Sequence, residues 1–377
     1  MKGHIYRQFV NLKKQFGPLV YWDIKADTLE EAHYILGERM RNHTKEGLRQ
    51  KLATIRKSKL HKELLFAQKC RLHLENRESE KVVGKNMKML LGEYLRCFKA
   101  WCKGAGIDEE VGFWLQNENI CCQTGMLRAE NGSIIAWHTE EEDPAQSYIL
   151  KPFMANFYIK NQSPLTSFIH PFYLPGTGFS WQKDFFLAVN SFYLKYNSED
   201  GGSLASVFSW MVWRLGTKAN FADILKMLCP FIDGYSILFV KKNQDKVEGG
   251  IIEFGANKFN IKMLGDTMND YLFLATIINQ NSSLIRYQTV TKKSKKKYYN
   301  RKLRTKVLLT RLFEREKNIT VKDILNMLAS RWGNGFAYCN KDVKAHVVAD
   351  MNKDALEIFV GAGPVLKDEL PKRVQIS

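Results

Sequence analysis

The sequence contains few prolines and cysteines, and it has no long apolar run. Nine prolines in 377 residues leave no proline-rich linker between domains. Seven cysteines, an odd number without the CxxC spacing of metal sites, predict free thiols in a reducing, cytoplasmic compartment. No apolar run reaches the roughly 18 residues that a membrane-spanning helix needs. Residues 1–8 are basic but precede no apolar stretch, so we expect no signal peptide.

The strongest signal in the composition is positive charge. Lys and Arg number 57 against 39 Asp and Glu, which gives a net charge of +18. Such an excess attracts anions but does not specify a fold. Hydrophobic residues make up 45% of the chain, which excludes a disordered or fibrous protein. The length allows two domains, and one large layered α/β domain accounts for it equally well.

The first third of the chain has helical periodicity. Apolar residues at helical spacing predict helices over 23–41, within 45–80, over 85–103 and from 107 onward. The first of these helices includes a capping-box sequence at Asp27–Glu30. Gly104 and Gly106 are expected to end the third helix.

The rest of the chain alternates between strand and helix patterns. Cys121–Leu127 and Ser133–Trp137 predict a hairpin that turns at Asn131-Gly132. Asn220 and Thr320 are expected to cap helices. Further strands are predicted at 155–160, 185–192, 235–240, 250–254, 345–350 and 356–360, and helix pairs within 203–229 and 307–332. This order is typical of a layered α/β fold rather than a βαβ repeat.

The predicted hairpin places a thiol beside acidic side chains. Its first strand begins with Cys121 and Cys122, and its end carries His138, Thr139, Glu140 and Glu141. An antiparallel hairpin returns to its own beginning, so these side chains lie within reach of Cys122. A cysteine is more often a buried filler, and acids after a strand more often form a solvated turn. A cysteine and several acids brought together by one hairpin indicate a functional site, although neither the cysteine nor the acids would do so alone.

Two further residues are candidates for chemistry. Asn190 lies inside a strand pattern between apolar neighbours, where a buried amide must find a partner or serve a site. As a donor it could hold a developing oxyanion. Arg286 follows a serine pair and is either a surface residue or a buried cation that fixes a carboxylate.

The remaining histidines receive structural interpretations. Four of them lie in the charged helical region and are expected to be solvated, namely His33, His43, His61 and His73. His170 and His346 have no paired ligand at metal spacing, so we expect no structural zinc and no cofactor.

The densest basic block, residues 291–306, allows three interpretations. Its lysines, interleaved with Tyr298 and Tyr299, could track a nucleic-acid backbone and stack on bases. No nucleic-acid-binding motif accompanies it, and we favour a solvated loop or helix face. The block could also attract an anionic acyl donor such as a coenzyme A thioester.

Taken in order, several segments make the chain similar to the acyl-coenzyme A:6-aminopenicillanic acid acyltransferase (isopenicillin-N acyltransferase) family of cysteine N-terminal-nucleophile hydrolases. The resemblance runs from about residue 18 to about residue 365. It is carried by Lys103–Ile107, Cys122-Gln123-Thr124, Asn131-Gly132, Leu174-Pro175-Gly176, Leu187–Ser191, Asp233–Ser236, Glu253-Phe254-Gly255 and Ser283–Arg286.

This resemblance implies a fold and a mechanism. The fold is a four-layer αββα sandwich over residues 122–377, with a helical, pro-segment-like region over residues 1–121. Cys122 is the implied nucleophile, which the chain exposes by cutting itself before that residue. Its freed α-amino group, with a pKa near roughly 7.7–8.0, is the general base. The implied substrate is a small-molecule amide or acyl thioester, which acylates the cysteine.

The other roles follow the same resemblance. Asn190 contacts the oxyanion, Glu141 or else Glu140 orients the amine, and Arg286 is the acid's ionic partner. Thr139-Glu140-Glu141 stands where the family has Asn-x-Asp, and Cys121 stands where it commonly has Gly. These departures leave two alternatives open. Cys121 could be the active thiol, or the chain could be an unprocessed binding protein of the same fold.

Overall fold

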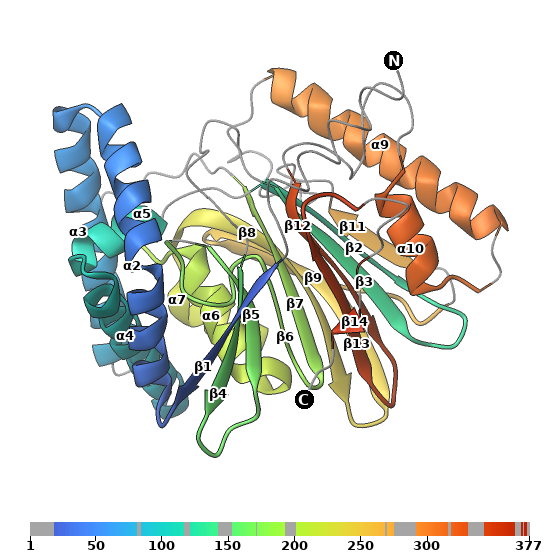
Figure 1. Cartoon of the computed structure of the whole chain (residues 1–377), viewed down its shortest axis with the longest axis horizontal. Helices are drawn as coiled ribbons and strands as arrows, with labels where there is room; N and C mark the ends of the chain where they lie inside the picture. Colours follow the sequence, from blue (N-terminus) through green and yellow to red (C-terminus); the bar gives the residue numbers. More distant parts are fainter. Residues whose placement is uncertain are drawn as a thin grey trace.

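A computed structural model describes most of the chain as helices and strands arranged in layers (Figure 1). The residues that it describes are 19–80, 84–116, 121–141, 153–170, 172–192, 201–267, 270–274, 292–315, 318–330, 343–365, 371 and 373–374. Within these residues, no helix is long and apolar enough to cross a membrane.

The N-terminal part of the described chain is one strand followed by four helices. They are β1 (Val20–Ala26), α2 (Leu29–Thr54), α3 (Lys57–Ser79), α4 (Lys85–Ala105) and α5 (Glu109–Gln116). The predicted helix over 23–41 was wrong at its start, because β1 pairs in parallel with β4 (Phe153–Ile159). The helix begins after Thr28, whose side chain accepts from the N–H of Glu31. The predicted stop is confirmed at Gly106, which closes α4 with a φ of 70°.

Eight strands form the first sheet, in the order β1-β4-β5-β6-β7-β8-β9-β10. Those not yet given are β5 (Leu165–Ile169), β6 (Phe179–Gln182), β7 (Phe185–Phe192), β8 (Phe231–Asn243), β9 (Lys246–Ala256) and β10 (Lys258–Met263). The pattern over 185–192 is confirmed as β7, with the same bounds. The short strands β5, β6 and β10 were not predicted.

Six strands form the second sheet, in the order β11-β2-β3-β12-β13-β14. They are β2 (Cys121–Arg128), β3 (Ile134–Glu141), β11 (Tyr271–Leu274), β12 (Val343–Met351), β13 (Leu356–Ala362) and β14 (Arg373–Val374). Residues 121 and 122, on either side of the expected division between an N-terminal region and a core, both belong to β2. That division stays a prediction.

The described residues of the second half of the chain form four α-helices, with a short 3-10 helix, Gly216–Lys218, after the first of them. They are α6 (Ala205–Leu215), α7 (Phe221–Leu228), α9 (Lys292–Arg315) and α10 (Val321–Leu328). Both predicted caps are confirmed: the Asn220 side chain accepts from a backbone N–H of α7, and Thr320 forms a capping box with Asp323. The predicted start of the first helix within 307–332 was wrong, because α9 already begins at Lys292 and takes in most of the basic block.

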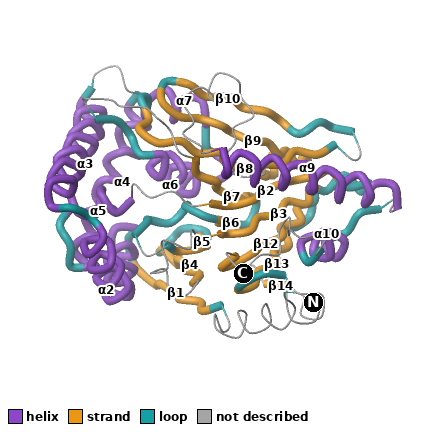
Figure 2. The backbone as a smooth tube through the Cα atoms, turned by 90° about the horizontal axis from the view of Figure 1, so that it is seen from above, coloured by secondary structure: helices purple, strands orange, loops and turns teal. Residues whose placement is uncertain are grey.

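Three buried clusters fix the order of the layers. Between the sheets, Met126 and Val347 of the second sheet pack with Phe186 and Leu238 of the first. A second cluster joins the outer side of the first sheet to α2, α4, α6 and α7, and a third joins the outer side of the second sheet to α9 and α10. The order is helices, sheet, sheet, helices (Figures 1 and 2). The predicted αββα sandwich is confirmed.

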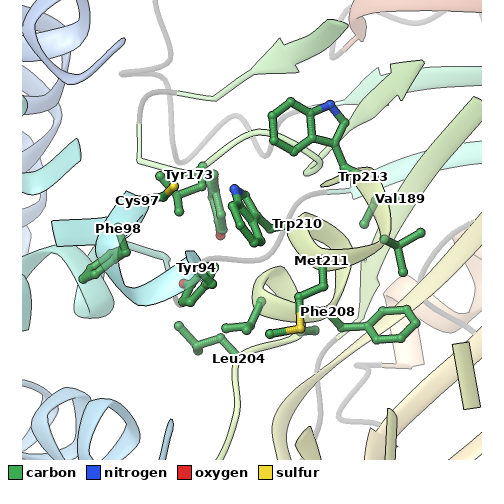
Figure 3. Packing of buried hydrophobic residues seen from close by; sticks show 14 of the residues in the cluster. Tyr94, Cys97, Phe98, Tyr173, Val189, Leu204, Phe208, Trp210, Met211 and Trp213 are labelled. Carbon is green, nitrogen blue, oxygen red and sulfur yellow. The ribbon is translucent and has the colours of Figure 1, made fainter. Parts of the chain in front are cut away.

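The cluster outside the first sheet is rich in aromatic side chains (Figure 3). Trp210 and Trp213 of α6 are fully buried, and the ring of Tyr94 meets Trp210 edge-on with 5.3 Å between centroids. The prediction that His33 is solvated was wrong. Its Nε2 accepts from Trp210 Nε1 at 3.1 Å and its Nδ1 donates to the Leu29 carbonyl, while burial lowers its pKa to about 4.

Candidate active site

The hairpin predicted from the sequence is present as β2 and β3. Its turn is closed by a hydrogen bond of 2.9 Å from the N–H of Ala129 to the carbonyl of Ser133. Gly132 has a φ of 81°, a conformation that glycine adopts without strain. This turn sets the register, which places Cys122 opposite Glu140.

Side-chain alternation divides the hairpin into two faces. The inner face points between the sheets, where Met126 and Ala136 join the apolar cluster. Its polar residues are Cys122, Thr124, His138 and Glu140. The outer face points toward α9 and α10, and Ile135 and Trp137 lie on it. Its described polar residues are Gln123, Thr139 and Glu141.

Glu140 is the centre of the polar group on the inner face. Its Oε1 lies 3.1 Å from Cys122 Sγ and 3.1 Å from Nε2 of His170, which follows β5 in the other sheet. Its Oε2 lies 2.9 Å from Nε2 of His138. All four residues are at most 3% exposed. One carboxylate therefore joins a thiol to two imidazoles in the interior.

Hydrogen bonds hold His138 at both ring nitrogens. Thr124 Oγ1 donates its single hydrogen to Asn190 Oδ1 at 2.8 Å, so it accepts from His138 Nδ1 at 2.9 Å. His138 Nε2 lies 2.9 Å from Oε2 of Glu140. The imidazole is therefore held between the hydroxyl of Thr124 and the carboxylate of Glu140.

Burial and the histidines act in opposite directions on Glu140. Burial raises its pKa, whereas the charges of His170 and His138 and their hydrogen bonds lower it. The histidines prevail, and the pKa of Glu140 falls from 4.5 to about 2. A carboxylate of this kind is a weak base at neutral pH, so Glu140 is suited to holding its neighbours in place rather than to taking the proton of the thiol.

Asn190 reaches this group from β7 of the first sheet. Its Oδ1 is held by Thr124, two residues beyond Cys122 on the same face of β2. The residue is 2% exposed, and its Nδ2 has no hydrogen-bond partner. A buried amide nitrogen without a partner is costly unless a ligand or a reaction intermediate uses it. Asn190 thus presents fixed N–H groups beside the thiol strand.

The structure separates the residues that the sequence proposed for the site. It brings together Cys122, Glu140 and, through Thr124, Asn190. Glu141 lies on the outer face and accepts from Gln123 Nε2 at 2.8 Å. The Thr139 hydroxyl is also on that face, buried and without a hydrogen-bond partner. Cys121 is paired with Glu141 in the register of the hairpin, and Arg286 lies outside the described residues.

Sequence reasoning gave no catalytic role to His138, which it placed within reach of Cys122, and none to Thr124 or His170. His138 and Thr124 share the alternation of Glu140 and Cys122, so strand periodicity applied to both strands would have put them on one face. His170 carries no such signal. It comes from another sheet, and only the packing of the two sheets brings it to Glu140.

A second buried carboxyl belongs to a segment that supported the family resemblance. Asp233 Oδ1 accepts from the N–H of Ala205 at 2.7 Å, at the first residue of α6. Burial raises the pKa of Asp233 to about 7 despite this hydrogen bond. Asp233 therefore ties β8 to α6, and its pKa is shifted in the opposite direction to that of Glu140.

No protein-family model matches the chain, and no curated protein matches it. Among solved structures, it is similar to the Caenorhabditis elegans ortholog of N-acylethanolamine-hydrolyzing acid amidase, with 12% sequence identity and a TM-score of 0.41. The match covers 60% of this chain and 92% of that chain. Similarity at this level does not bear on the reaction or on the site residues.

Proposed function

We propose that the chain is a cysteine amidohydrolase or acyltransferase of the N-terminal-nucleophile type, with Cys122 as its nucleophile. The observation that carries the proposal is the contact of 3.1 Å between Cys122 Sγ and Glu140 Oε1. It joins a thiol, which packs with the larger buried cluster, to a charged carboxylate that also contacts two histidines. Burying such groups costs free energy, so a cluster of this kind is more typical of a functional site than of a filler.

The reaction would transfer the acyl group of a small-molecule amide or acyl thioester. The sulfur of Cys122 attacks the carbonyl carbon and forms a C–S bond, while the thiol proton passes to a base. The tetrahedral oxyanion then collapses, and the leaving amine or thiol departs with a proton. Water or an amine attacks the acyl-cysteine in the second half, which releases the acyl group and returns a proton to sulfur.

The base in this proposal is the α-amino group of Cys122, set free by self-cleavage after Cys121. An amine with a pKa of about 7.7–8.0 can accept a proton at neutral pH, which Glu140 is poorly suited to do. Glu140 lies opposite Cys122 in the hairpin and would hold the protonated amine close to the sulfur. We therefore assign the orienting carboxylate to Glu140 rather than Glu141.

Asn190 supplies the oxyanion contact in this mechanism. Because Thr124 holds its Oδ1, the amide plane is fixed and Nδ2 keeps its two hydrogens for a ligand. Donors that are oriented before the reaction stabilise developing charge without reorganising. The family resemblance of the sequence around this asparagine supports the same role.

Mass spectrometry tests both halves of the proposal. We expect purified protein to contain a fragment that begins at Cys122, and an activated acyl thioester to add one acyl group to that residue. Cys122→Ala should abolish both. Cys97→Ala is the matched control, because Cys97 is a buried thiol on α4 whose pKa is raised by burial. An intact chain in which Cys122 reacts no faster than Cys97 would instead identify an unprocessed binding protein of this fold.

A further inference from the structure

The inner face of the hairpin has the donor atoms of a metal site as well as those of a nucleophile. We propose that Cys122, His138 and Glu140 bind a Zn²⁺ ion, which holds the cysteine as a zinc thiolate and blocks its reaction with acyl donors. The proposed binding of Zn²⁺ is argued from geometry alone, whereas the proposed inhibition by Zn²⁺ rests on the proposed function of Cys122.

The donor atoms already have the spacing of a metal site. The sulfur, the imidazole nitrogen and a carboxylate oxygen all lie within 4.8 Å of one another. Zn²⁺ takes ligands at about 2.0–2.3 Å in a tetrahedron, which puts its donor atoms about 3.3–3.7 Å apart. The two carboxylate contacts, 3.1 Å from Oε1 to Sγ and 2.9 Å from Oε2 to Nε2, lie a few tenths of an ångström below this range.

The chemistry of the donors also favours zinc. Thiolate, imidazole and carboxylate are its usual protein ligands, and two of the three are nitrogen and sulfur rather than the oxygens that Mg²⁺ and Ca²⁺ require. A water or hydroxide is the expected fourth ligand.

The surroundings fix the imidazole in the orientation that a metal needs. Thr124 accepts the proton on Nδ1 of His138, which leaves Nε2 as the atom directed toward Glu140 and Cys122. Such outer contacts hold the tautomer and the plane of metal-bound histidines. Thr124 is itself hydrogen-bonded to Asn190, so a residue of the other sheet helps to fix the orientation of the His138 ring.

This proposal departs from the expectation of no zinc drawn from sequence spacing. That expectation looked for ligand pairs within short segments, as in CxxC sites. Here Cys122 lies on one strand and His138 and Glu140 lie on its partner, so the site depends on the register of the hairpin.

Cobalt is the first probe, since Co²⁺ replaces Zn²⁺ and reports its ligands. We expect the full-length wild-type chain to bind one Co²⁺ with a near-ultraviolet thiolate-to-metal band, and stoichiometric Zn²⁺ to displace it. Absence of the band would overturn the proposal without recourse to any variant.

Substitutions then assign the ligands. Cys122→Ala should remove the band and weaken Zn²⁺ binding at least about a hundredfold, and Thr124→Val, which touches only the outer contact, about tenfold. Cys97→Ala should change neither. Folding of each variant is checked by its thermal unfolding. Equal affinity in Cys122→Ala and wild type would show that the zinc binds elsewhere.

The block is tested separately from the binding. Zn²⁺ should protect Cys122 from the activated acyl thioester, and a chelator should restore its reaction. If the chain shows the cobalt band but is never acylated, the result supports the metal site and contradicts the proposed enzyme activity. If acylation continues at saturating Zn²⁺, the proposed inhibition of Cys122 by zinc is contradicted.

Discussion

The two faces of the β2–β3 hairpin carry similar side chains but different environments. Each face has a glutamate, Glu140 on the inner face and Glu141 on the outer. The inner carboxylate meets a thiol and two histidines, while the outer one accepts a hydrogen bond from the amide of Gln123. Adjacent residues of one strand therefore have unrelated chemistry, because a strand turns successive side chains to opposite sides.

The difference between the two faces shows which interactions suit a buried carboxylate to a functional site. The outer face supplies Glu141 with a hydrogen bond from the neutral amide of Gln123. The inner face instead gathers charged and nucleophilic groups around one acid, which lowers the pKa of Glu140 despite its burial. Substitutions that treat the faces identically measure this difference directly.

The largest expected contrast is in stability. Glu140→Gln removes the carboxylate charge that its surroundings stabilise, which should lower the free energy of unfolding by about 3 kcal/mol. Glu141→Gln keeps an oxygen that can accept from Gln123 and should cost about 1 kcal/mol or less. Urea unfolding at pH 7 measures both. Equal losses would mean that the faces do not differ energetically.

A matched pair of amides gives the second contrast. Asn190→Ala removes the proposed oxyanion donors and should slow the acylation of Cys122 about a hundred- to a thousandfold. Gln123→Ala removes an amide from the outer face and should leave the rate within about a few fold. The rates come from mass spectrometry with an activated acyl thioester. If Gln123→Ala is the slower variant, the inner face is not the reactive one.

Acid pH should reduce the difference in stability between the wild type and Glu140→Gln. The pKa of Glu140 is lowered from 4.5 to about 2 in the folded chain, so its contribution is full above pH 4.5 and is lost as pH falls toward 2. The difference between wild type and Glu140→Gln should therefore shrink over this window, by on the order of 3 kcal/mol. Urea unfolding at a series of pH values follows it. A difference that stays constant down to pH 2.5 would contradict a charged Glu140.

The smallest effect is expected at Thr139. Its hydroxyl is buried on the outer face without a hydrogen-bond partner, so Thr139→Val should leave acylation unchanged and raise the free energy of unfolding by about 1 kcal/mol. Thermal unfolding and the acylation rate check this. A loss of acylation would instead support Thr139 as one of the site residues that the sequence indicated.

Local patterns in the sequence predicted the parts of the fold that local interactions determine. Alternation and apolar content defined β7 to the residue, and cap residues located the starts of α7 and α10. The strand β1 was missed. Its pairing is a parallel contact with β4, far along the chain, which no local pattern expresses.

The sequence by itself determined the hairpin that carries Cys122 and the set of acids at its end. The turn chemistry and the strand alternation are properties of adjacent residues, so they can be read without a structure. The tertiary structure decided which acid meets the thiol, since the register puts Glu140 opposite Cys122. It also decided what else joins them, because His170 and Asn190 come from the facing sheet and arrive only through the packing of the two sheets.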